Sequence, residues 1–401
     1  MPVYRAAWVL PIAAPPIRNG WVEVEDGRIV GVGGGPRLNT IDLGAVAILP
    51  SLVNAHTHLE LSYLRGAIPK ATRFLDWIRG VMAARRRYAD PADPTILYAA
   101  RRGISESRAA GTGLIGDISN TLVTVPLLQR ADVPAHVFHE LLGFNVPDPE
   151  SRVSAARAAI DSARSKAPIV RASLAPHAPY SVSPALLAAI RRDLDRHRDD
   201  VSSIHLAESP DEVQFLKSGG GGWKRLLTEL DVWTDSWRPP RMSPIGYLEA
   251  SGFLDSRMLI VHSVQCGSDD LARVKAAGAT IVSCPRSNRY VGVGDPPLAD
   301  FYASGASVAF GTDSLASVED LNVFGELSAA RRLAPAVAAS RLLESATLTG
   351  ARALGFGREL GSLEPGKRAS LISVRVPDAV DDVEEYVISG IEPDAIAWLD
   401  V

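Results

Sequence analysis

The sequence predicts an α/β protein, a (β/α)8 barrel joined to a small β-sandwich domain that both chain ends form together. Three observations support this. Eight short apolar runs alternate with Ala/Leu/Arg-rich helical stretches along the middle of the chain. The spacing between His56 and Asp313 is close to the roughly 250 residues that an eight-stranded barrel needs. Both termini carry strand-type runs instead. A doubly wound open sheet is the alternative, but no glycine fingerprint follows the first strand.

The two ends of the chain have the pattern of short strands. Near the N-terminus, strand-type residues flank the hairpin turn at residues 25–28. Near the C-terminus, β-rich runs cover residues 370–376, 387–390 and 395–401. Neither end is long enough to form a stable core alone. We therefore expect one β-sandwich domain from residues 1–50 and 360–401, and a catalytic barrel over residues 51–359.

The expected barrel strands follow in order along the central part of the chain. The first run leads into Asn54, and the later runs are Gly113–Ile118, Ala135–Phe138, Ile169–Leu174, Val201–Ile204, Met258–Val261, Thr280–Val282 and Val308–Phe310. Helical patterns lie between them, for example over Pro184–Arg198 and Asp269–Ala277. Residues 209–247 interrupt this rhythm with a glycine run. We interpret them as a long loop, either a lid over the substrate or a surface insertion.

Composition and charge exclude several classes of protein. The 401 residues carry a formal net charge of −4, without the basic excess of a nucleic-acid binder or of a membrane-surface protein. The two cysteines, Cys266 and Cys284, exclude a disulfide scaffold, and we expect two buried thiols. The apolar stretch at residues 6–17 is too short and too rich in proline to span a bilayer. We expect a soluble cytoplasmic protein with no nucleic-acid or membrane partner.

Residues of the types that bind metals follow the predicted strands. His56 and His58 stand two positions apart, so both side chains can face the same side of a strand. His205, His262 and Asp313 each stand at the end of a later run. These strand ends meet at the face where barrel enzymes place their chemistry. Several imidazoles with a carboxylate suit Zn²⁺ or Fe²⁺, although any one of these residues alone could be structural.

Glu208 adds a group that can transfer protons. It lies three residues after His205, where the chain has just left the predicted strand. From there its carboxyl can lean over the mouth of the site, and a carboxyl beside a metal-bound water is well placed for proton transfer. The alternative is an exposed glutamate in a loop.

Six segments together resemble the amidohydrolase superfamily, in particular its mononuclear-metal aminohydrolases, which include cytosine, guanine and S-adenosylhomocysteine deaminases. These segments are residues 52–58, 205–208, 261–263, 284–288, 311–314 and 361–367. The resemblance implies that His56, His58, His205 and Asp313 are metal ligands. It also implies a divalent ion as cofactor, with Zn²⁺ as our first expectation and Fe²⁺ as the alternative.

The same resemblance implies roles in catalysis. Glu208 and His262 are similar to the proton shuttle and the water-orienting group of the family, and Asp313 to the group that takes a proton from the water. Dinuclear members bridge two metals with a carbamylated lysine on the fourth strand. The corresponding run, residues 169–177, contains no lysine, and Lys166 precedes it. We therefore expect one metal ion.

Five further residues are candidates for substrate contacts. In the adenine-type deaminases of the family, the position of His177 contacts the substrate. Glu60 can line the pocket or support the residues that do. Asp76 and Trp77 can bind a ribose hydroxyl and stack on a base, or they belong to a buried amphipathic helix. Arg286 can hold a carboxylate or lie at the surface.

At subfamily level, residues 56–62, 74–78 and 175–181 look most like the aminodeoxyfutalosine deaminases of the futalosine route to menaquinone. This implies a hydrolytic deaminase that releases ammonia from a small-molecule purine nucleoside. Ser283 stands where many relatives have a histidine, which concerns substrate contacts. The alternatives are deamination of methylthioadenosine, S-adenosylhomocysteine or guanine, dechlorination of a triazine, and a non-catalytic scaffold. Barrels of this family often pair, so the resemblance also implies a homodimer as a further expectation.

Overall fold

Two parallel sheets form the centre of the molecule. The computed structural model describes residues 2–163 and 169–399. The central strands are β8 (Leu52–Thr57), β9 (Thr112–Ser119), β10 (Ala135–Leu141), β11 (Val170–Pro176), β12 (Ser202–Leu206), β13 (Met258–His262), β14 (Thr280–Ser283) and β15 (Ser307–Phe310). They pair in the orders β11-β10-β9-β8 and β12-β13-β14-β15, with every pairing parallel. The predicted α/β class and each predicted run in this region are thus confirmed.

Hydrogen bonds connect the two parallel sheets at both of their margins. Between β15 and β8, the backbone amide of Asp313 donates to the carbonyl of His56 at 3.0 Å. Between β11 and β12, the amide of His205 donates to the carbonyl of His177 at 2.9 Å. Both contacts lie at the C-terminal ends of the strands. The residues that follow these strands are therefore held close to one another.

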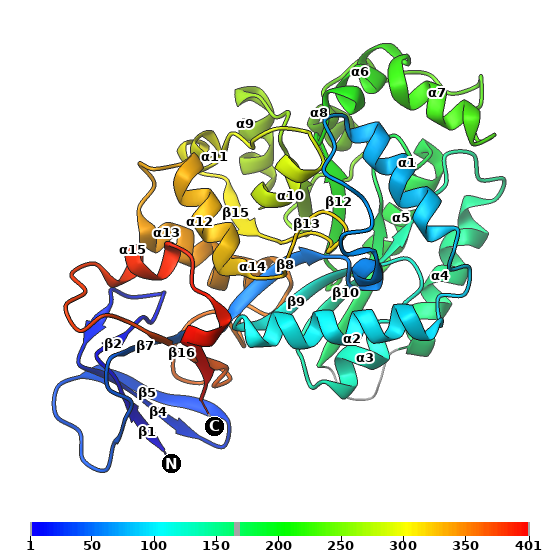
Figure 1. Ribbon diagram of the computed structural model, residues 1–401. Coiled ribbons are helices and arrows are strands. Elements are labelled where there is room, and N and C mark those ends of the chain that lie inside the picture. Colours follow the sequence, from blue (N-terminus) through cyan, green and yellow to red (C-terminus); the bar gives the residue numbers. More distant parts are fainter. Residues whose placement is uncertain (1, 164–168, 400–401) are drawn as a thin grey trace.

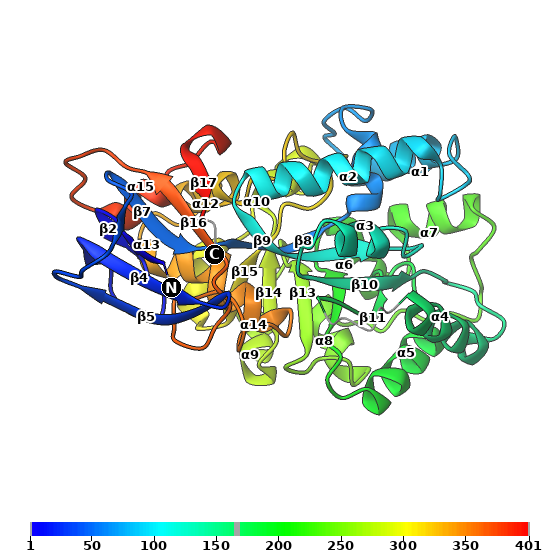
Figure 2. The ribbon, with the colours of Figure 1, turned by 90° about the horizontal axis from the view of Figure 1, so that it is seen from below.

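Helices follow the central strands and cover them on the outside. They are α1 (Phe74–Arg85), α2 (Pro94–Ala109), α3 (Val125–Arg130), α4 (Pro149–Ala163), α5 (Pro184–Arg196), α6 (Pro210–Ser218), α7 (Gly221–Glu229), α8 (Pro244–Ala250), α9 (Ser268–Ala277), α10 (Pro285–Tyr290), α11 (Leu298–Ser304), α12 (Val323–Leu333), α13 (Ala339–Glu344) and α14 (Gly350–Ala353). A 3₁₀ turn, η1 (Leu59–Leu64), follows β8, and a π turn, η2 (Ser345–Thr349), precedes α14. Figure 2 shows α2, α4, α5 and α9 outside the strands. The two predicted helices correspond to α5 and α9.

Strands from both chain ends form two further sheets at one end of the molecule (Figure 1). These strands are β1 (Val3–Arg5), β2 (Trp8–Val9), β3 (Ile17–Arg18), β4 (Gly20–Glu25), β5 (Arg28–Gly34), β6 (Ile41–Asp42), β7 (Val46–Pro50), β16 (Leu371–Arg375) and β17 (Ile396–Trp398), the last preceded by the 3₁₀ turn η3 (Pro393–Ala395). The sheets have the orders β5-β4-β1-β6 and β17-β16-β7-β2-β3. One apolar cluster joins residues of both sheets, including Val22 on β4 and Leu371 on β16. Residues 400 and 401 of the predicted last run lie outside the described residues.

The prediction of a strand at residues 387–390 was wrong, because residues 387 and 388 end helix α15 (Val383–Ile388) and residues 389 and 390 follow it. The side chain of Asp382 accepts a hydrogen bond from the amide of Glu385 at 3.0 Å and so caps the helix. Val383 and Val387 lie one helical turn apart, and both are buried. The cap and this spacing outweigh the strand preference of the β-branched residues.

The segment over residues 209–247, which we interpreted as a long loop, is instead largely helical. The segment contains α6 and α7 and the start of α8. Ser209 caps α6 by accepting a hydrogen bond from the amide of Glu212 at 3.3 Å. Gly219, with φ +72°, ends α6 in the left-handed conformation that glycine adopts without strain. Phe215 and Trp237 are buried and stack with ring centroids 4.5 Å apart, so the segment is packed and largely helical.

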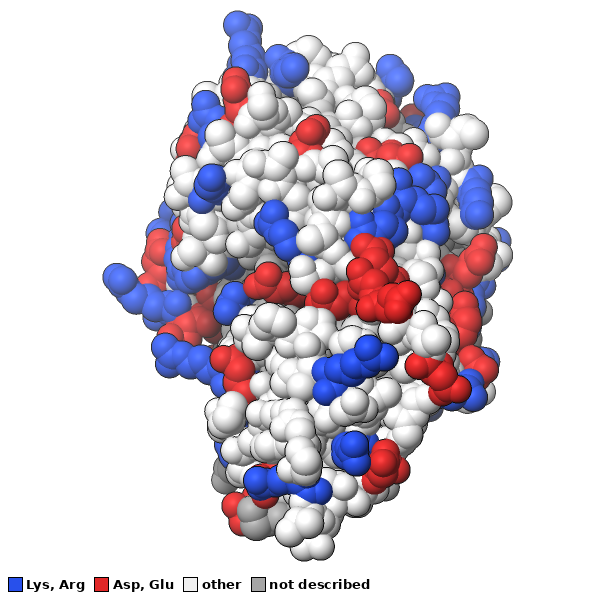
Figure 3. Space-filling view, turned by 90° about the vertical axis from the view of Figure 1, so that its left-hand side faces the viewer, with Lys and Arg blue, Asp and Glu red and all other residues white. Residues whose placement is uncertain are grey.

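The composition predicts two buried thiols and no excess of basic residues. Cys266 and Cys284 are free and buried, as expected. Within residues 2–163 and 169–399, every helix is too short or too polar to cross a membrane. On the face drawn in Figure 3, basic and acidic side chains are interspersed.

Candidate active site

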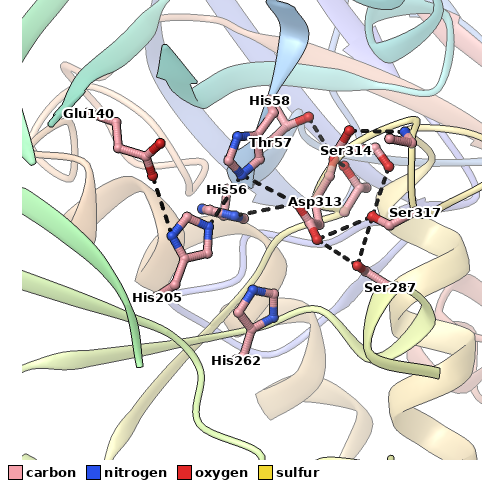
Figure 4. A network of polar contacts seen from close by, with 12 residues as sticks. His56, Thr57, His58, Glu140, His205, His262, Ser287, Asp313, Ser314 and Ser317 are labelled. Carbon is pink, nitrogen blue, oxygen red and sulfur yellow. Dashed lines mark hydrogen bonds and ion pairs between the residues drawn. The ribbon is translucent and has the colours of Figure 1, made fainter. Parts of the chain in front are cut away.

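Four side chains from three strand ends converge at one point (Figure 4). His56 lies in β8 and His58 directly follows it, His205 lies in β12, and Asp313 follows β15. The ligand atoms that the three histidines offer lie within 4.8 Å of one another. His58 Nε2 is 3.3 Å from His205 Nε2. Asp313 Oδ1 is 3.4 Å from His58 Nε2 and 3.6 Å from His56 Nε2. Three nitrogens and one oxygen thus face a common centre.

The chain after β15 is fixed against β8 by a set of buried polar contacts. The side chain of Asn54 donates to Thr312 Oγ1 at 2.8 Å and accepts from the Thr312 amide at 3.1 Å. Thr57 Oγ1 donates to the carbonyl of Asp313 at 2.8 Å. Asp313 has φ +62°, which is uncommon for a residue other than glycine. The surrounding contacts hold this backbone in the orientation that points the carboxylate at the histidines.

Gly311 permits the close approach of β15 to β8. A Cβ at this position would lie 2.7 Å from both Cβ and the carbonyl oxygen of His56. We expect Gly311→Ala to lower the free energy of unfolding by about 1–3 kcal/mol, because His56 backbone atoms cannot move aside. Urea unfolding measures this loss. Gly267→Ala is the control, since a Cβ there meets nothing within 4 Å. Equal stability of the two variants would contradict the prediction.

Hydrogen bonds fix which atoms of the cluster face its centre. Asp313 Oδ2 accepts from Ser287 Oγ at 2.5 Å and from Ser317 Oγ at 3.2 Å, so Oδ1 is left for the histidines. His205 Nδ1 lies 3.1 Å from the carbonyl of His177 and donates to it, which leaves the lone pair on Nε2. Both ring nitrogens of His56 are buried without a hydrogen-bond partner in the described residues. A bound cation would satisfy such an atom.

The electrostatics of the cluster also fit a divalent cation. Burial lowers the pKa of His58 to about 3, against the opposing effect of Asp313. Burial lowers the pKa of His205 well below its ordinary value, helped by the neighbouring histidines. These imidazoles are therefore neutral at pH 7, and only the neutral ring offers a lone pair to a metal. Three imidazoles and one carboxylate are a donor set that Zn²⁺ and Fe²⁺ accept.

Glu208 and His262 lie beside this cluster. His262 Nε2 is 3.6 Å from Glu208 Oε1. His262 Nδ1 is 2.8 Å from Asn288 Oδ1 and donates to it, so the lone pair of the neutral ring is on Nε2. Burial raises the pKa of Glu208 well above its ordinary value, and the nearby Asp313 and Glu212 add to this effect. The Glu208 carboxyl can therefore carry a proton at neutral pH and donate it.

Three of the substrate candidates are described first: one lies beside the histidine cluster, and two lie on helix α1. His177 lies next to the cluster, with its ring centroid 5.0 Å from that of His205, and its Nδ1 is 2.6 Å from Ser181 Oγ. Trp77 lies in α1, and its indole nitrogen is buried without a hydrogen-bond partner among the described residues. Asp76 also lies in α1, and its side chain is 58% exposed. A buried, unpaired N–H such as that of Trp77 is available to a ligand.

The other two substrate candidates are engaged within the chain. Glu60 is buried and accepts hydrogen bonds from Ser119 Oγ at 2.8 Å and from the amide of Asn120 at 3.0 Å. Arg286 donates to buried Glu326 at 2.6 Å and to further acceptors in residues 320–322. These contacts tie η1 to the segment after β9, and α10 to α12.

Sequence reasoning assigned no role to four side chains that support the site, namely Glu212, Ser287, Asn288 and Ser317. Glu212 is the least expected of them. Its two carboxylate oxygens accept the backbone amides of Ala207 and Glu208, each at 2.9 Å, where Ala207 has φ +53°. The signal was present, because Ser209 and Glu212 form the S-x-x-E pattern of a helix capping box. In the folded protein, the Glu212 carboxylate binds the turn that carries Glu208 instead of the start of the helix.

The fold and the convergent His/Asp cluster together have the pattern of the amidohydrolases. Residues 47–392 match the amidohydrolase family. The chain belongs to this family. β11 contains no lysine, and Lys166, which precedes it in the sequence, lies outside the described residues.

Individual relatives are deaminases. The chain is 35% identical over 322 residues to the aminodeoxyfutalosine deaminase of Deinococcus radiodurans, covering 78% of this chain and 74% of that protein. It is 29% identical to the 5-methylthioadenosine/S-adenosylhomocysteine deaminase of Syntrophobacter fumaroxidans, over 88% of this chain and 80% of that one. Its structure resembles an adenosine deaminase from Xanthomonas campestris with bound zinc, with a TM-score of 0.84, 25% identity and coverage of 98% and 90%.

Proposed function

We propose that this protein is a metal-dependent hydrolytic deaminase that releases ammonia from an adenine-type nucleoside. The observation that carries this proposal is the convergence of three imidazoles and the Asp313 carboxylate beside the buried Glu208. The relatives support it, since two of them deaminate adenine nucleosides by name.

We assign one divalent ion to His56, His58, His205 and Asp313, with Zn²⁺ as the first candidate and Fe²⁺ as the second. The Xanthomonas campestris relative contains zinc, which supports this order. Such an ion, when bound, lowers the pKa of a water molecule from ~16 to about 7 and makes hydroxide available at neutral pH.

The side chains around the ion then move protons. Asp313 takes a proton from the attacking water through Oδ1, because Oδ2 is held by Ser287 and Ser317. Glu208 gives its proton to the ring nitrogen next to the carbon that bears the amine. His262 orients the water through Nε2, since Asn288 fixes its other nitrogen. The oxygen adds to that carbon, and the exocyclic amine receives the proton that Asp313 took from the water. The bond to this nitrogen then breaks, ammonia leaves, and the proton of the new hydroxyl group returns to Glu208 as the carbonyl forms.

We propose aminodeoxyfutalosine, an intermediate of the futalosine route to menaquinone, as the substrate. The 35% identical relative carries this activity in its name. His177 and Trp77 are the residues that we assign to purine contacts, because the first adjoins His205 and the second has an unpaired indole N–H. Glu60, Asp76 and Arg286 we assign to the walls of the pocket, where Glu60 and Arg286 already have partners in the chain.

A panel of substrates tests this proposal. Ammonia release would be measured with the Zn²⁺-loaded protein on aminodeoxyfutalosine, methylthioadenosine, S-adenosylhomocysteine, adenosine, guanine and a chlorotriazine. We expect the highest kcat/KM for aminodeoxyfutalosine. A higher value for methylthioadenosine or S-adenosylhomocysteine would favour the second activity, which the Syntrophobacter fumaroxidans relative has by name. No turnover of any compound by the metal-loaded protein would favour a scaffold.

We further propose that the two parallel sheets close into a (β/α)8 barrel over residues 51–359, and that residues 1–50 and 360–401 form a β-sandwich domain. The hydrogen bonds at both margins of the parallel sheets support closure. The apolar cluster shared by the two terminal sheets supports the sandwich. With no basic excess in the sequence, we propose a cytoplasmic enzyme whose partner is its small-molecule substrate.

A further inference from the structure

Glu140 is a buried carboxyl that the mechanism above does not use. It stands near the C-terminal end of β10 and is 6% exposed. Its Oε1 is 3.4 Å from His205 Nδ1, the ring nitrogen that faces away from the metal centre (Figure 4). A carboxylate behind a metal-binding histidine fixes the tautomer and the orientation of the ring and raises its basicity.

The other oxygen of Glu140 is held by Asn120. Asn120 Nδ2 donates to Glu140 Oε2 at 2.8 Å. The amide cannot be turned round, because Asn120 Oδ1 accepts from Arg85 Nη1 at 3.1 Å. The backbone amide of Asn120 also donates to Glu60 at 3.0 Å, which fixes the position of the residue. Glu140 is therefore oriented so that one oxygen faces Asn120 and the other faces His205.

His205 in turn has acceptors on one side and the metal centre on the other. Nδ1 lies 3.1 Å from the carbonyl of His177 and 3.4 Å from Glu140, and both are acceptors. Nδ1 therefore carries the hydrogen. Nε2 is left with its lone pair toward His58 Nε2, 3.3 Å away. This is the tautomer that a metal at the proposed centre requires.

We propose that Glu140, oriented by Asn120, is a positioning residue that holds His205 in its metal-binding tautomer and strengthens its bond to the ion. The inference rests on the proposed metal site but not on the identity of the substrate. Its measure is therefore the affinity for Zn²⁺, which can be determined without any turnover.

An alternative role for Glu140 and His205 is to bind a second cation. Glu140, His177 and His205 offer ligand atoms within 4.8 Å of one another. Such an ion would compete for the nitrogen that donates to the His177 carbonyl, so His205 would have to lose its remaining N–H. The geometry therefore favours the positioning role, and the number of Zn²⁺ ions bound per chain separates the two.

Glu140→Gln tests the inference. If the glutamine oxygen keeps the contact with Asn120, its NH₂ group faces the N–H of His205, so one of the two contacts is lost. We expect the dissociation constant for Zn²⁺, measured by competition with a chromophoric chelator, to rise about 10- to 100-fold. Glu208→Gln is the matched control, because it alters another buried carboxyl of the site and should leave Zn²⁺ affinity unchanged.

Exchanging the two side chains provides a rescue. Asn120→Asp combined with Glu140→Gln keeps the net charge and lets the new aspartate accept from the glutamine NH₂, which returns an oxygen to His205. We expect this double variant to recover part of the Zn²⁺ affinity and so to exclude general misfolding. If Glu140→Gln changes KM while Zn²⁺ affinity stays at the wild-type value, or if it removes a second equivalent of Zn²⁺, the inference is wrong. Wild-type protein that binds Zn²⁺ tightly but deaminates no nucleoside would contradict the proposed function alone.

Discussion

Glu208→Gln is expected to keep its metal and to lose kcat by about 10²- to 10⁴-fold, the usual contribution of a positioned proton-transfer group. The side chain is 4% exposed and lies 3.6 Å from His262 Nε2, outside the set of four proposed ligands. Glutamine has nearly the same shape but no proton to give to the ring nitrogen. Steady-state kinetics on the best substrate of the panel, with metal content measured on the same sample, gives both quantities.

The contrast between turnover and metal content makes this prediction specific. Loss of the metal together with activity would show that Glu208 supports the ligand cluster. Unchanged kcat would show that another group protonates the ring. Glu212→Gln is a useful companion, because Glu212 holds the backbone amide of Glu208 but stands outside the set of groups proposed to transfer protons. We expect it to lower kcat less than Glu208→Gln does.

Removal of the metal is expected to abolish turnover and to lower the thermal stability of the protein. The donor set consists of side chains from distant parts of the chain, so the folded protein binds the ion and the unfolded chain does so weakly. An ion present at 1,000 times its dissociation constant stabilises the folded state by about 4.1 kcal/mol. Dialysis against a chelator, followed by one equivalent of Zn²⁺ or Fe²⁺, should remove and restore both activity and melting temperature.

Single histidine variants sharpen this test. We expect His205→Ala to bind Zn²⁺ weakly and to gain little stability from added metal. His197→Ala is the control, because His197 follows α5, away from the cluster, and contacts Asp193. Full activity of the chelated protein, or equal loss of Zn²⁺ from both variants, would contradict the assignment of the ligands.

Much of the architecture follows from local sequence signals. The central strands are buried along nearly their whole length, so each appears as a short continuous apolar run bounded by turn residues. The metal-type residues stand directly at the ends of these runs, which made His56, His58, His205 and Asp313 recognisable. The errors at residues 387–390 and 209–247 have a common cause. Helix caps and tertiary burial decided between two structures that short apolar or glycine-rich segments allow.

The supporting side chains are less accessible to sequence reasoning. Ser287 and Ser317 are small polar residues of a kind found throughout any chain, and nothing local marks them as partners of Asp313. Glu140 stands in a buried run, and nothing local marks it as a partner of His205. From the sequence alone, Arg286 could bind a substrate carboxylate. In the folded protein its guanidinium donates to the buried Glu326 on another helix.

The order of apolar runs, the spacing of histidines and the chemistry of the residue types are properties of the chain itself, and they determined the fold class and the nature of the metal-type cluster. The direction of each ring nitrogen, the choice of Asp313 Oδ1 over Oδ2, and the partners of Glu140 depend on residues that lie tens to hundreds of positions apart in the chain. Only folding brings those residues within hydrogen-bond distance, because strand pairing and helix packing, not proximity along the chain, set which polar groups meet.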